Sequence, residues 1–128
     1  MIITKYVQDW FTLAEDDLLT SRTLLDQKVS NNQACFHCQQ VAKKYLKGFL
    51  AYREKHIRKI HDIEILLSYC KEIDSSFEEL SHDAFYLTQL YLTSRYPDDY
   101  QEFSYEEAER AYQAALKVKD FVLERIKG

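Results

Sequence analysis

Apolar residues recur every three or four positions along most of the 128-residue chain, which is the spacing of one face of an α-helix. Polar or proline-containing segments interrupt the pattern at four places. It predicts helices over about 4–27, 33–53, 60–71, 76–93 and 104–127. Helices joined by short to moderate loops favour an all-α fold, an up-and-down bundle of four long helices plus one short helix.

Local signals sharpen the expected ends of these helices. Residues 30–33, 76–79 and 104–107 have the Ser-x-x-Gln or Ser-x-x-Glu spacing of a capping box, in which the serine accepts a hydrogen bond from the third helical residue. We therefore expect each box to open a helix, the middle one opening the fourth. The only proline, Pro97, disfavours helical angles at the residue before it, so 94–100 is expected to be a loop.

The composition narrows the class of protein. With only two glycines and one proline, both an all-β fold and a glycine-rich phosphate loop are disfavoured. There is neither a run of about 18 uncharged apolar residues nor the apolar core of a signal peptide. An odd number of cysteines, three, speaks against a disulfide framework. We expect a single cytoplasmic domain over residues 1–128, with no membrane association.

Positive charge is concentrated in one part of the chain. The formal net charge is -4, but residues 43–61 contain seven Lys or Arg side chains and one acid. Such a segment could attract an anion, a nucleotide among others, or the acidic surface of a partner. The alternative interpretation is a solvated helix end followed by a polar loop.

Candidate ligand-binding residues lie in and around this segment. Gln40, Lys43 and Lys47 share one stripe of the predicted second helix, and their amide and ammonium groups could donate to a phosphate. The stripe could equally be the solvated face of the helix. His61 could act as a general base oriented by Asp62, although Asp62 is as plausible as an acid of the first helical turn.

The proline-containing loop supplies a second group of candidates. Arg95 offers a planar, bidentate donor for phosphate or carboxylate, and Tyr96 offers a ring on which a base could stack. In the alternative, Arg95 pairs with Asp98 or Asp99 and the loop is a rigid turn. If this loop and the stripe of the second helix face one cleft, together they would form a nucleotide site.

The Cys-x-x-Cys spacing of Cys35 and Cys38 is interpreted as core packing. Both fall on the apolar face of the predicted second helix, where cysteine behaves as a small hydrophobic residue. A structural zinc site needs four ligands, and the chain has no second such pair. We therefore predict neither a metal nor a cofactor.

Four segments, taken in order, carry a family resemblance. Residues 10–18 fit Trp-x-x-x-Ala-x-x-Asp-Leu, and 34–47 begin Ala-Cys-Phe and continue with Gln-Gln-Val-Ala-Lys-Lys. His-Asp follows at 61–62 and Ser-Arg-Tyr-Pro-Asp at 94–98. Together they resemble the HEPN family, named for higher eukaryotes and prokaryotes nucleotide-binding. The resemblance covers roughly residues 6–126.

The resemblance implies a helical bundle that commonly forms homodimers and often works with a minimal nucleotidyltransferase, as in a toxin–antitoxin pair. Some HEPN proteins are ribonucleases whose signature is Arg, four to six residues, then His. No arginine of this chain has a histidine at that spacing, and the positions so placed after Arg95 hold Tyr100, Gln101 and Glu102. No catalytic residue is therefore assigned.

Three hypotheses follow. The first is a nucleotide-associated binding module that partners a nucleotidyltransferase, with a nucleotide or another phosphorylated molecule as ligand. The second is a ribonuclease toxin that uses a non-standard pair such as Arg95 with His61. The third is a purely structural oligomerisation domain.

Overall fold

A computed structural model describes residues 3–57, 59–94, 97 and 101–126, with only the backbone of 91–94. Every regular element in this part of the chain is helical. The elements are α1 (Lys5–Asp26), α2 (Asn31–Tyr52), α3 (Ile63–Ile73), the 3-10 helix η1 (Ser75–Leu80), α4 (Ser81–Ser94) and α5 (Tyr105–Ile126). The predicted all-α fold, with four long helices and one short helix, is confirmed.

Two of the three predicted capping boxes begin helices. The Ser30 hydroxyl accepts a hydrogen bond from the backbone N–H of Gln33 at 3.1 Å and caps α2. Ser104 and Glu107 bond reciprocally at the start of α5, through the Glu107 N–H at 3.0 Å and the Ser104 N–H at 2.9 Å. The side chains thus satisfy backbone donors that a helix leaves without partners in its first turn.

The third box, at 76–79, does not open α4, which begins at Ser81. Instead Asp74, two residues earlier, accepts hydrogen bonds from the Ser76 N–H at 3.0 Å and the Ser76 hydroxyl at 2.6 Å. A carboxylate is the stronger acceptor, so Asp74 caps a 3-10 turn and uses Ser76 as a donor. The predicted start of the fourth helix was therefore wrong.

The start of α3 was also predicted a few residues too early. Asp62 is its N-cap residue, and its carboxylate accepts from the backbone N–H groups of Glu64 at 2.8 Å and Ile65 at 3.1 Å. The helix therefore begins at Ile63 and not near Ile60. Asp62 is thus the residue that caps the helix, and not an acid within its first turn.

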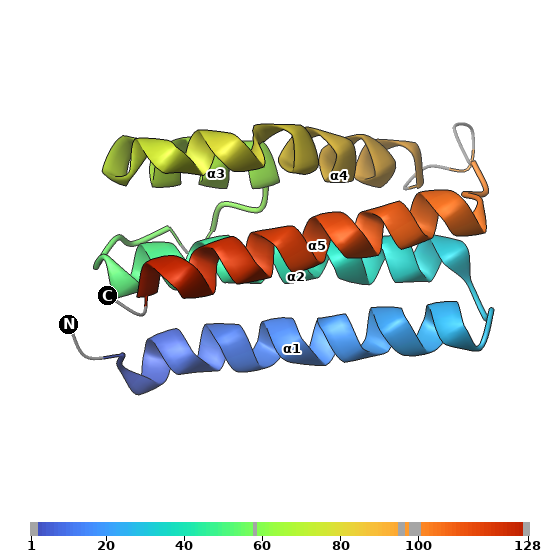
Figure 1. The fold of residues 1–128 in the computed structure, drawn as a ribbon, viewed down its shortest axis with the longest axis horizontal. Coiled ribbons are helices and arrows are strands. Elements are labelled where there is room, and N and C mark those ends of the chain that lie inside the picture. Colours follow the sequence, from blue (N-terminus) through green and yellow to red (C-terminus); the bar gives the residue numbers. More distant parts are fainter. Residues whose placement is uncertain (1–2, 58, 95–96, 98–100, 127–128) are drawn as a thin grey trace.

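Helix α2 lies at the centre of the bundle. It packs against α1 on one side, against α5 in front, and against α3 and α4 on the other side (Figure 1). All of its predicted apolar positions are buried: Ala34, Cys35, Cys38, Val41, Ala42, Tyr45, Leu46 and Phe49. Because three sides of α2 are covered, one side is left, and it carries the half-buried residues Phe36, Gln40 and Lys43.

Gly48 sets the close approach of α1 to α2. A Cβ atom at this position would lie 2.3 Å from Cε1 of Phe11. The Phe11 ring, in turn, stacks on the Tyr45 ring with centroids 5.3 Å apart. The missing side chain thus makes room for an aromatic pair between the two helices.

None of the helices in the described ranges combines the length and the apolar character that a membrane crossing requires.

Candidate functional site

The polar stripe of α2 is defined as Gln40, Lys43 and Lys47. Gln40 and Lys43 are half-buried. Lys47 differs from the expectation of a solvated face, because the residue is only 3% exposed. Its ammonium nitrogen lies 5.2 Å from the centroid of the Trp10 ring on α1, in a cation–π contact.

The burial of Lys47 has electrostatic consequences. Removal from water lowers its pKa, and the neighbouring positive charges of Lys43 and Lys44 lower it further. A lysine is seldom this buried, and here the side chain carries its charge into the contact between α1 and α2. Positive potential is therefore concentrated at the end of the polar stripe where Lys43 and Lys47 lie.

His61 belongs to the same group. It is exposed and precedes α3, yet its pKa is lowered from the usual 6.5, first by the charge of Lys47, then by slight burial and by the charge of Lys43. A repulsion of this kind requires proximity. Lys43 and Lys47 lie one helical turn apart on α2, and His61 is within range of their charges; we call these three residues the cationic cluster.

A second set of charged residues lies beside the stripe and was not predicted. The carboxylate of Asp17 on α1 lies 2.8 Å from His37 Nδ1 and 2.5 Å from Lys44 Nζ, both on α2. Asp17 occupies a position between the apolar Ala14 and Leu18, and the residue is buried. A polar residue at the edge of an apolar stripe was the signal for this contact, since a buried carboxylate requires partners.

Arg95, Tyr96 and Asp98 lie outside the described residues. The segment after them is held at the start of α2, where the Asn32 side chain donates to the Gln101 carbonyl and accepts from the Phe103 N–H, both at 2.9 Å. Lys47 lies fifteen positions further along α2, which corresponds to about 22 Å. The cationic cluster and the described end of this loop are therefore at different places along the helix.

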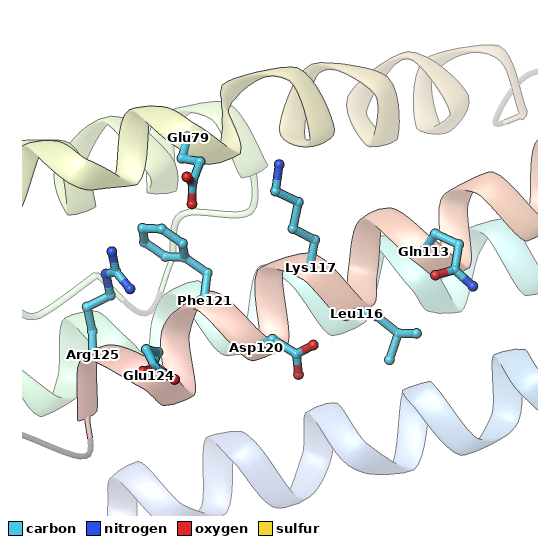
Figure 2. A pocket seen from close by; sticks show the side chains of 8 residues that line it. All are labelled: Glu79, Gln113, Leu116, Lys117, Asp120, Phe121, Glu124 and Arg125. Atoms are coloured by element: carbon cyan, nitrogen blue, oxygen red, sulfur yellow. The ribbon is translucent and has the colours of Figure 1, made fainter.

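A pocket on the outer side of α5 includes none of the predicted ligand residues. In Figure 2, Glu79 reaches from η1 toward Phe121 on α5. Arg125 lies over the Phe121 ring at 3.6 Å and donates to the hydroxyl of Ser76 at 3.1 Å, and Lys117 pairs with an aspartate of α4 at 3.3 Å. These charges are engaged with their neighbours, so the pocket adds nothing to the candidate site.

The three cysteines are buried and unpaired, which confirms the interpretation of Cys35 and Cys38 as core residues. Burial raises the pKa of each thiol to about 12, so the reactive thiolate is suppressed. Within the described ranges, no three His, Cys, Asp or Glu side chains gather as metal ligands.

The fold and the site define the class as an all-helical bundle whose central helix carries a stripe of polar and basic residues. The family model of the HEPN domain matches residues 7–126. The chain belongs to the HEPN domain family.

Two solved structures are similar over most of their length. The crystal structure of TT1696 from Thermus thermophilus shares 30% identity and a TM-score of 0.84, over 94% of this chain and 98% of that one. The structure of ST0689, described as an archaeal HEPN homologue, shares 28% identity and a TM-score of 0.77, over 94% and 97%. No curated protein matches the sequence.

Proposed function

We propose that this HEPN domain, over residues 1–128, is a nucleotide-associated binding module. Phosphate groups of the ligand bind where Lys43 and His61 meet the solvent, with the amide of Gln40 as a further donor. The observation that carries the proposal is the cationic cluster, in which Lys43 and Lys47 lie one helical turn apart on α2 and the buried Lys47 is held against Trp10. An anion bound beside Lys43 and Lys47 would interact favourably with the positive charge that these two residues concentrate there.

The role of each residue in the cationic cluster follows from its burial. Lys43 is half-buried and His61 is exposed, so both can contact a ligand directly. Lys47 is buried against Trp10 and acts through its field, which water screens less than the field of a surface lysine. A charge-assisted hydrogen bond from Lys43 and a hydrogen bond from a ring N–H of His61 would hold the phosphate oxygens.

We extend the proposal to partners. The domain works as a homodimer with a minimal nucleotidyltransferase, in a toxin–antitoxin-like pair. Membership of the HEPN family supports this extension. Arg95, Tyr96 and Asp98 remain proposed contacts to the ligand.

Calorimetric titration with ATP tests the phosphate-binding function. We expect measurable binding that weakens with salt, and a loss of roughly 10-fold or more in Lys43→Met, the effect of removing one charged hydrogen bond. Lys117→Met makes the same change of charge on α5, where Lys117 pairs with Asp83, and should leave the affinity unaltered. Absence of binding at millimolar ATP, or an equal loss in both variants, would reject the proposal.

A further inference from the structure

Two aromatic side chains of α1 lie beside the cationic cluster. Tyr6 and Trp10 are one helical turn apart, and their ring centroids are separated by 6.2 Å in an edge-to-face arrangement. Tyr6 is 49% exposed and Trp10 is half-buried.

The two rings of α1 lie beside the lysines of α2. Trp10 contacts the ammonium group of Lys47 at 5.2 Å, and Lys47 is the residue whose charge affects His61 most. Lys43 lies one helical turn before Lys47 on the same helix, so the rings of Tyr6 and Trp10 lie beside the part of α2 that carries both lysines. Cations beside exposed aromatic rings are the combination that holds a phosphate and a base together.

We propose that Tyr6 and Trp10 form an aromatic subsite, on which the base of a nucleotide stacks while its phosphates bind at Lys43 and His61. The ligand class is then a nucleoside phosphate, and not inorganic phosphate or a phosphorylated sugar. Tyr6 supplies most of the accessible ring surface, because Lys47 already covers part of Trp10. The inference rests on the proposed phosphate-binding function. It adds recognition of the base, because the cations alone cannot distinguish a nucleotide from another phosphorylated molecule.

The test compares ATP with inorganic triphosphate by calorimetry. Both carry the phosphate chain, but only ATP carries the ribose and the base, so the variant Tyr6→Ala is needed to assign the preference to the base. We expect the protein to bind ATP roughly 5- to 150-fold more tightly, which is the effect of one base stacked on an aromatic side chain. Tyr6→Ala should remove this preference while the affinity for triphosphate stays the same.

Tyr105→Ala is the matched control. Tyr105 is also an exposed tyrosine, 38% accessible, with a cation nearby, since Lys28 Nζ lies 5.8 Å from its ring. It belongs to the start of α5, so its replacement should leave the preference for ATP intact. Thermal melting of both variants verifies that the fold is retained.

Trp10 provides a second measurement, because it is the only tryptophan of the chain. Its emission should change when ATP binds and change much less with triphosphate at equal saturation. Equal affinity for ATP and triphosphate, or an unchanged preference in Tyr6→Ala, would overturn the aromatic subsite and leave the phosphate site standing. If neither molecule binds, the phosphate site and the aromatic subsite are both rejected.

Discussion

The carboxylate of Asp17 on α1 accepts a hydrogen bond from the ammonium group of Lys44 on α2, at 2.5 Å. The same carboxylate lies 2.8 Å from Nδ1 of His37. All three side chains are largely withdrawn from solvent. Because two side chains of α2 contact this one carboxylate of α1, Asp17 connects the two helices. An unpaired charge would be costly at this buried position.

We predict that Asp17→Asn lowers the free energy of unfolding by about 1.5–3 kcal/mol, the usual worth of hydrogen bonds to a charged group. Urea denaturation measures the loss. Asp9→Asn is the control on the same helix, where Asp9 pairs with Lys5 and both side chains are exposed. That variant should lose less than about 1 kcal/mol. Equal losses would show that burial of Asp17 does not increase its contribution to the free energy of unfolding.

The second prediction concerns Gly48. Alanine is favoured over glycine in a helix by about 1 kcal/mol, so propensity alone predicts that Gly48→Ala stabilises α2. The added Cβ would lie 2.3 Å from Phe11, whose ring is held against Tyr45. We expect a net destabilisation of about 1–3 kcal/mol, as for an overpacked core.

A double-mutant cycle shows whether this contact is the cause. Phe11→Leu removes the ring that the new methyl group meets, so Gly48→Ala should cost less in that background than in the wild type. The difference between the two costs is the coupling, measured by chemical denaturation. Identical costs in both backgrounds would mean that the loss has another origin.

The helices could be predicted because their periodicity is strong and because α2 buries its apolar face on all its neighbours. The starts of α2 and α5 were predictable because the serine of the capping box itself caps the helix, at Ser30 and at Ser104. They were mispredicted at 62 and 74, where an aspartate is the better acceptor and moves the start of the helix. Spacing identifies a cap, but competition between neighbouring acceptors decides which one is used.

The candidate site was predictable only in part. Helical spacing placed Gln40, Lys43 and Lys47 on one stripe, which the structure keeps. It could not show that Lys47 is buried, because burial depends on Trp10 of another helix. Nor could it show that His61 lies near Lys47, since that depends on the path of the segment before α3. Contacts between elements have no signature in local spacing.

The third prediction is a dimer in solution. Several large apolar side chains remain exposed on the single chain, among them Leu13, Leu19 and Phe85. Exposed apolar surface of this kind favours association, and homodimers are expected of the family. Light scattering at micromolar concentration should give about twice the chain mass of 15.3 kDa. A mass of one chain over a wide concentration range would contradict it.

The last prediction uses the titration of His61. Its pKa in the folded protein is lowered, chiefly by Lys47, so Lys47→Met should raise it toward 6.5. Proton NMR of the imidazole measures the value, and His61→Gln identifies its signal among the four histidines. Lys117→Met, which removes a lysine from α5, should leave the pKa unchanged.

The sign of the effect on stability follows from proton binding. The unfolded chain binds a proton at His61 near pH 6.5, whereas the folded chain binds it only at lower pH. The folded state is therefore destabilised as the pH falls below about 6.5, and the decrease ends below the folded pKa. His61→Gln should flatten stability over this interval, and so should an anion bound at the cationic cluster. If the pKa of His61 is the same in the wild type and in Lys47→Met, the two side chains are too far apart to form one site.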